Sequence, residues 1–135
     1  MIRIFTSAQL HLTSRTACIF DVFGDKEVVI PALTDPEIGD NTHTRDPKVW
    51  KGSDAWYMVL GSTTKDHKGE ALFYKSEDLS HWHLAGQATT KQKLGWMWEC
   101  PDLFNVNGRS VFVFLPDGTD RGHRRLCGSG DLYAA

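Results

Sequence analysis

The chain has 135 residues, of which 41% are hydrophobic and 24% charged, and its 15 Lys and Arg against 17 Asp and Glu leave a net charge of -2. This is the composition of an ordinary globular protein with one domain at most. The basic residues are dispersed, no apolar run approaches the length of a membrane span, and the three Cys lack C-x-x-C spacing, so we expect no nucleic-acid partner, no membrane segment and no metal site.

The first part of the chain contains few structural signals. Residues 1–16 show no clear period and are predicted to be a poorly ordered leader, and because residues 1–7 lack the long apolar core of a signal peptide, we expect a cytoplasmic location. Residues 18–23 are apolar and predict a strand. Residues 34–44, rich in Asp, Pro, Gly and Thr, predict a loop.

The centre of the chain predicts four strands in succession. The first follows Arg45-Asp46-Pro47, where an acid precedes a proline that opens an apolar run. The expected strands cover residues 48–50, 56–60, 71–75 and 82–85, and polar turns containing Gly, Asp or Ser separate them.

A second acid lies in Trp96-Met97-Trp98-Glu99-Cys100-Pro101-Asp102, where Glu99 stands between two indoles and beside a thiol. Such neighbours disfavour the charged form of a carboxylate, as a general acid working near neutral pH requires. The alternative is structural, since a Glu beside Trp is often a half-buried surface residue and Asp-Pro is a common turn dipeptide.

The two acidic motifs belong to a repeat. Superposing Pro47 on Pro101, 54 residues later, aligns residues 48–50 with 102–104 and residues 56–60 with 111–115, to within a residue. This offset is close to the period of a propeller blade, which has four antiparallel strands. We therefore expect both carboxylates at equivalent places in successive blades, at the same end of adjacent inner strands and facing one cleft.

These motifs resemble glycoside hydrolase family 32, the group of invertase, levanase and sucrose-6-phosphate hydrolase, over about residues 24–115. The resemblance implies an all-β fold, a five-bladed β-propeller followed by a β-sandwich. This chain would supply the end of one blade, one complete blade and the start of a third, because 135 residues are too few for five blades of about 50. Residues 17–116 would form this propeller fragment, and residues 117–135, where the strand pattern is lost, a disordered or non-native tail.

The resemblance also implies retaining cleavage of β-fructofuranosyl bonds without a cofactor. In that scheme Glu99 is the acid/base, Asp46 stabilises the transition state and binds fructosyl hydroxyls, Arg45 supports substrate binding, and Cys100 tunes Glu99. The family's nucleophile is an aspartate in a W-M-N-D-P-N-G motif, which this chain does not contain. Asp35, in the only other Asp-Pro pair, lacks that context and is not assigned as nucleophile.

Two function classes follow. The first is a glycosidase fragment, inactive alone, that acts on sucrose, sucrose 6-phosphate or a fructan. The second is a non-catalytic carbohydrate-binding or structural remnant, since two acids without a nucleophile still bind hydroxyl groups. Either would self-associate through exposed blade edges, with Trp50, Trp56, Tyr57 and Phe112 as candidate surface residues.

Overall fold

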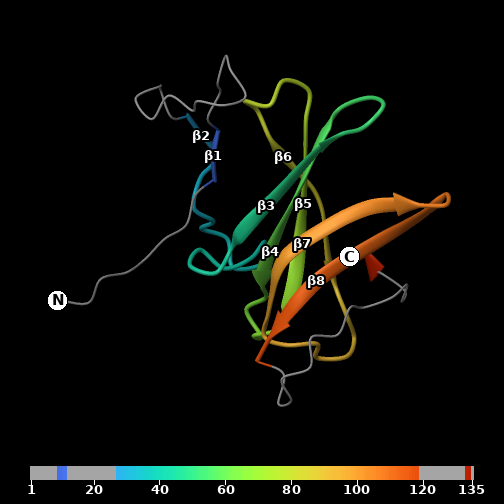
Figure 1. The fold of residues 1–135 in the computed structure, drawn as a ribbon. Coiled ribbons are helices and arrows are strands. Elements are labelled where there is room, and N and C mark those ends of the chain that lie inside the picture. The colour runs from blue at the N-terminus through green and yellow to red at the C-terminus, as the bar shows by residue number, and fades with distance from the viewer. Residues whose placement is uncertain (1–8, 12–26, 119–132, 135) are drawn as a thin grey trace, which may run out of the picture.

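The computed structural model describes residues 9–11, 27–118 and 133–134, and every regular element in these ranges is a β-strand (Figure 1). This confirms the all-β prediction. The strands are β1 (Gln9–His11), β2 (Glu27–Ile30), β3 (Arg45–Lys51), β4 (Trp56–Thr63), β5 (Gly69–Ser76), β6 (His83–Thr89), β7 (Met97–Val106), β8 (Arg109–Asp117) and β9 (Tyr133–Ala134). Within the described ranges no helix is long and apolar enough to span a membrane.

The four central strands form an antiparallel meander in the order β3-β4-β5-β6, with the short β9 added at the β6 edge, and β7 and β8 form a separate hairpin. β1 pairs with β2, so residues 9–11 of the predicted leader have a partner strand. The predicted strand at 18–23 and most of the predicted tail lie outside the described residues. The domain boundaries therefore stay predictions.

The strands carrying the acids are longer than their apolar runs indicate. β3 begins at Arg45 and β7 at Met97, so both acidic motifs lie inside strands and not ahead of them. Both strands tolerate a proline because, among the described strands, β3 is hydrogen-bonded only to β4 and β7 only to β8.

The hairpin turn between β7 and β8 is set by two residues. Asn107 and Gly108 have φ values of 51° and 77°, the left-handed conformation that both central residues of a type I′ turn require. The side chain of Asn105 accepts a hydrogen bond from the Gly108 amide at 2.9 Å. The strands consequently continue to within two residues of each other.

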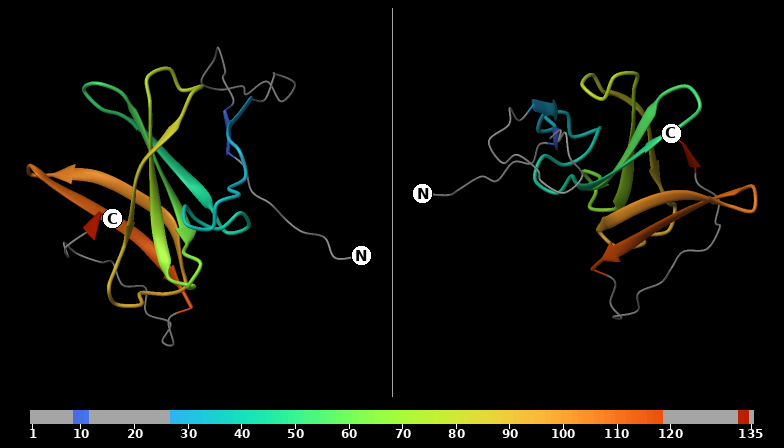
Figure 2. Two further views of the ribbon diagram at one scale, coloured as in Figure 1. Left: turned by 180° about the vertical axis from the view of Figure 1, so that it is seen from behind. Right: turned by 45° about the horizontal axis from the view of Figure 1, so that its top comes forward.

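The central sheet lies between the β7–β8 hairpin and the β1–β2 pair (Figure 2). Because strand residues alternate between faces, each face of the sheet has its own core. One face packs five buried residues, Ile30, Met58, Leu60, Leu72 and Tyr74. The other packs Val59, Ala71, Trp98, Phe112 and Phe114. The nearly continuous apolar run of β4 is thus explained by burial on both faces.

Trp98 joins the hairpin to the sheet. Its side chain is fully buried, stacks on Phe114 with ring centroids 3.9 Å apart and donates from Nε1 to the carbonyl of Leu94 at 2.8 Å. Two glycines make room for it: a Cβ on Gly61 would lie 2.0 Å from the Trp98 carbonyl oxygen, and one on Gly69 would lie 2.1 Å from the indole ring. These contacts fix the position of β7 against the sheet.

Candidate functional site

Strands β3 and β7 lie side by side and run in the same direction. Three pairs of residues connect them: Arg45 with Glu99, Asp46 with Cys100, and Lys48 with Asp102. Each pair is separated by the same 54 residues, which requires parallel strands in register. The sequence repeat is therefore also a spatial alignment.

Matching β-bulges shape both strands at this point. The register of β3 against β4 shifts between Arg45 and Lys48, and that of β7 against β8 shifts between Glu99 and Asp102. In each bulge the residue before proline has a positive φ, 60° at Asp46 and 47° at Cys100. Bulges redirect side chains and free backbone groups from the ladder, and this leaves the Cys100 amide available to the neighbouring strand.

The prediction that the two acids occupy equivalent places is wrong by one residue. Asp46 is equivalent to Cys100, and Glu99 is equivalent to Arg45, as both the bulge positions and the contacts between β3 and β7 show. The proline alignment already implied this offset. The acids still lie at the same end of the two strands, because their positions differ by a single residue across the pair.

The Glu99 carboxylate is bound by a cation, the guanidinium of Arg45. Its Oε1 accepts a hydrogen bond from Arg45 Nη2 at 2.6 Å, and both side chains are 36% exposed. Trp98 points to the opposite face of β7 and into the core. Trp98 is therefore not packed against the Glu99 carboxylate, because alternation along the strand separates the adjacent side chains.

Asp46 is half-buried, and its carboxylate contacts Cys100 twice. Oδ2 accepts a hydrogen bond from the Cys100 amide at 2.9 Å and another from the Cys100 thiol at 3.6 Å. Burial, followed by the charge of Asp46, raises the pKa of the Cys100 thiol, so at neutral pH the thiol stays protonated and donates. The thiol hydrogen-bonds Asp46, whereas the sequence reading related it to Glu99.

Lys48 and Asp102 are site neighbours that the motif analysis did not single out. Lys48 Nζ lies 3.1 Å from Asp102 Oδ2, while the other oxygen, Oδ1, is buried without a hydrogen-bond partner. The sequence repeat could have identified this pair. The 54-residue offset that aligns the prolines also aligns Arg45 with Glu99 and Lys48 with Asp102, so that each pair joins opposite charges. Exposed ion pairs of this kind contribute at most about 1 kcal/mol to stability, and their effect here is to hold the strands in register.

The sequence analysis also did not single out Glu70, which is a buried acid. Glu70 on β5 is 4% exposed, and its Oε1 has no hydrogen-bond partner. Burial raises the pKa of Glu70 to about 7, and a hydrogen bond with Ser62 opposes that shift. Glu70 lies across from Ser62 in the pairing of β4 and β5, and its position in an alternating strand with a polar neighbour gave no sign of burial.

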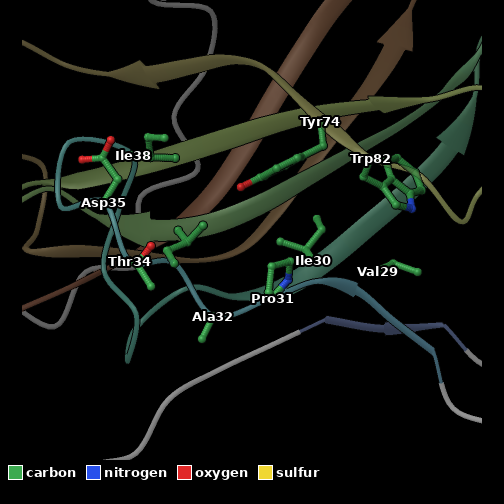
Figure 3. Close-up of a pocket in the computed structure, with 10 residues that line it drawn as sticks. Val29, Ile30, Pro31, Ala32, Thr34, Asp35, Ile38, Tyr74 and Trp82 are labelled. Carbon is green, nitrogen blue, oxygen red and sulfur yellow. The ribbon is translucent and has the colours of Figure 1, made fainter.

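The pocket in Figure 3 lies away from the acids, between the segment after β2 and the sheet. It has a volume of about 210 Å³, and the aromatic rings of Tyr74 and Trp82 form part of its wall. A wider apolar groove of about 440 Å³ lies on the opposite face, with Trp50, Tyr57 and Phe73 in its lining. Neither hollow is lined by Arg45, Asp46, Glu99 or Cys100.

In the described part of the chain, no group of three or more His, Cys, Asp or Glu is suited to hold a metal ion.

Several known proteins are similar to this chain in sequence and in fold. The profile of the glycosyl hydrolases family 32 N-terminal domain matches residues 6–133. The chain is 51% identical over 77 residues to a sucrose-6-phosphate hydrolase of Vibrio alginolyticus, covering 56% of this chain and 16% of that protein. It is 40% identical over 101 residues to a sucrose-6-phosphate hydrolase of Bacillus subtilis, covering 71% and 20%.

A solved structure gives the same result. A mutant GH32 β-fructofuranosidase of Bombyx mori, in complex with sucrose, superposes with a TM-score of 0.56 at 37% identity, covering 70% of this chain and 20% of that one. The chain thus spans about a fifth of the length of these proteins, and its sheets form part of a β-propeller.

Proposed function

Because the chain belongs to glycosyl hydrolase family 32, we propose that residues 45–102 supply two of the three carboxylates with which a retaining enzyme cleaves a β-fructofuranosyl bond. Glu99 is the acid/base, and Asp46 stabilises the charge that develops on the sugar ring and binds its hydroxyl groups. Arg45 supports substrate binding and places a positive charge beside Glu99.

One observation carries this proposal: the matched bulges of β3 and β7 bring both acids to the same end of two neighbouring inner strands. Arg45 reaches Glu99 and Asp46 reaches the Cys100 amide across the same junction. A carboxylate held by a backbone amide keeps a fixed direction. Preorganised charge of this kind stabilises a transition state without reorganisation.

The chemistry then takes two steps. A nucleophilic carboxylate from another part of the enzyme attacks the anomeric carbon of the fructosyl group while Glu99 donates a proton to the leaving oxygen. In the second step Glu99 takes a proton from water, and the resulting hydroxide displaces the enzyme carboxylate to release fructose. No step requires a cofactor.

The relatives suggest the substrate to test first. Both relatives named above are sucrose-6-phosphate hydrolases, and the similar solved structure is a β-fructofuranosidase in complex with sucrose. We infer that the leaving group is glucose or a glucose phosphate, with sucrose 6-phosphate as the first candidate. The alternative is a sugar-binding segment without turnover, in which the same acids only accept hydrogen bonds from hydroxyl groups.

A chimera separates these functions. The matching segment of the Bacillus subtilis relative is replaced by residues 27–118 of this chain, and fructose release is measured for the chimera and for its Glu99→Gln variant. Loss of the proton donor is expected to lower kcat by roughly 10²- to 10⁴-fold. A Glu99→Gln chimera with unchanged kcat on sucrose would refute Glu99 as the acid/base. If the 135-residue chain binds sucrose but no chimera turns it over, the segment is a sugar-binding module without catalysis.

We also propose that the isolated chain self-associates through the hairpin. Within the described residues β8 pairs only with β7, and Phe104, Val106 and Leu115 on these strands are 44%, 45% and 37% exposed. An unpaired strand with apolar side chains is a template for another chain. Of the four candidate surface residues, Trp50, Trp56 and Tyr57 are half-buried, whereas Phe112 is 8% exposed and belongs to the core.

A further inference from the structure

We propose that His43 is a positioning residue that directs the Arg45 guanidinium toward Glu99. The inference rests on the proposed function, because it concerns how the acid/base is held. His43 lies in the segment that enters β3, outside the motifs that the sequence analysis singled out.

The guanidinium of Arg45 is shared between two acceptors. Nη2 donates to Glu99 Oε1 at 2.6 Å, and Nη1 faces Nδ1 of His43 at 3.5 Å. Guanidinium nitrogens only donate hydrogen bonds, so Nδ1 must be the acceptor, and the ring proton belongs on Nε2. The two contacts constrain the rotation of a planar group more than either does alone.

His43 is itself fixed by groups from both blades. Its backbone amide donates to Asp40 Oδ1 at 2.9 Å, and its ring meets Trp96 edge to face with centroids 4.9 Å apart at 88°. Trp96 stands directly before β7, and its amide donates to the carbonyl of Asp117 at 2.9 Å. His43 thus links the entry of β3 to the entry of β7, beside the ion pair that joins those strands.

This arrangement assigns two separable properties to one side chain. The ring packs on Trp96, and Nδ1 accepts from Arg45. A purely structural histidine would need only the first property. A positioning histidine needs the second property. Without its second acceptor the Arg45 guanidinium rotates and carries the Glu99 carboxylate away from the leaving oxygen. A displacement of about 1 Å costs up to roughly 10²-fold in rate.

Two variants of the chimera separate these properties. His43→Asn places an amide oxygen near the position of Nδ1 and removes the ring, while His43→Phe keeps a ring against Trp96 and removes the acceptor. We expect His43→Phe to lower kcat roughly ten- to a hundredfold with little change in KM, and His43→Asn to retain most of kcat, at matched melting temperatures. The opposite order, or equal losses in the two variants, would overturn the proposal.

Arg45→Gln is the control that distinguishes this inference from the proposed function. If Arg45→Gln lowers kcat but His43→Phe does not, the positioning role is wrong and the site assignment stands. If neither variant changes kcat, the assignment of Arg45 fails as well.

A spectroscopic measurement requires no turnover. In ¹⁵N-histidine-labelled chain, measured at a pH at which histidine rings are neutral, the His43 proton should lie on Nε2, and Arg45→Gln should shift the Nδ1 resonance. A proton on Nδ1 in the unsubstituted chain would overturn the inference, because that nitrogen could not accept from Arg45.

Discussion

The carboxylate of Asp46 accepts a hydrogen bond from the backbone amide of Cys100 at 2.9 Å, across two strands that are not hydrogen-bonded to each other in a sheet. Asp46 is therefore an acceptor for the neighbouring strand, in addition to the charge toward the sugar that we propose for it. Its φ of 60° adds a third requirement, since Asn and Asp tolerate this region better than other residues with a Cβ.

Asp46→Asn and Asp46→Ala should consequently differ. Asn keeps the acceptor and the backbone preference but loses the charge, so kcat of the chimera should fall by roughly 10²- to 10³-fold, as when an electrostatic stabiliser is removed, with the melting temperature retained. Ala should lower kcat similarly and also cost about 1 to 2 kcal/mol of stability through the left-handed φ. Equal melting temperatures of the two variants would contradict the structural function of this residue.

Gly61→Ala tests the close approach of β7 to the sheet. A Cβ there would lie 2.0 Å from the Trp98 carbonyl oxygen, whereas a Cβ on Gly86 meets nothing within 4 Å. We expect Gly61→Ala to lower the free energy of unfolding by about 1 to 3 kcal/mol, as overpacking does, and Gly86→Ala to be nearly neutral. Urea denaturation of both variants checks this difference, and similar midpoints would show that β7 does not approach as described.

Glu70 should make stability depend on pH. Its folded pKa of about 7 lies above the ordinary value of 4.5, so the folded state binds the proton more tightly than the unfolded state. The resulting stability is fully present below pH 4.5 and is lost as pH rises through about 7, with a span of roughly 3 kcal/mol. Glu70→Gln should remove most of this dependence.

The control for Glu70 is Glu77→Gln, which alters an exposed carboxylate directly after the same strand. Denaturant midpoints measured from pH 4.5 to 8 should fall with pH in Glu77→Gln as in the unsubstituted chain. A Glu70→Gln variant whose midpoints fall just as steeply would mean that another group carries the dependence.

The 135-residue chain alone should release no fructose from sucrose or sucrose 6-phosphate. It contains no W-M-N-D-P-N-G aspartate, and without a nucleophile the acid has no displacement to complete. An assay for free fructose at high protein concentration checks this expectation. Turnover that disappears on Asp35→Asn would show that Asp35, excluded above, serves as the nucleophile.

Association through the hairpin should respond to charge at its surface. Lysine on exposed strand positions opposes strand pairing between chains, so Phe104→Lys with Leu115→Lys should shift the chain toward the monomer in size-exclusion chromatography. Val28→Lys, at a position 54% exposed on β2, is the matched control and should leave the elution volume unchanged. If only the control shifts the elution, the interface lies on the other face.

Much of the fold was predictable because hydrophobic runs and turn residues determine strand order. The run from Trp56 to Leu60 predicted β4, and the superposition of Pro47 on Pro101 predicted that two units repeat. Strand ends were predicted poorly, since the polar residues Arg45 and Glu99 belong to strands through backbone pairing that side-chain patterns do not reveal.

The sequence named four candidate site residues but did not predict their contacts. Arg45, Asp46, Glu99 and Cys100 do come together, yet the pairs they form depend on two bulges that move the register by one residue. A bulge involves one extra residue in one strand, and its position depends on the partner strand. The burial of Glu70 escaped prediction for a related reason, because it depends on which face of the sheet another segment covers.

The constant separation of 54 residues between facing groups has a consequence for how such a ring is assembled. Exact copies of one blade would place an arginine against an arginine and a lysine against a lysine at this junction, and like charges at that distance repel. At this junction the facing residues therefore differ in the sign of their charge although their backbones correspond. A duplicated pair of units would therefore gain from paired substitutions at this junction, and those substitutions would make the two faces of the junction different from each other.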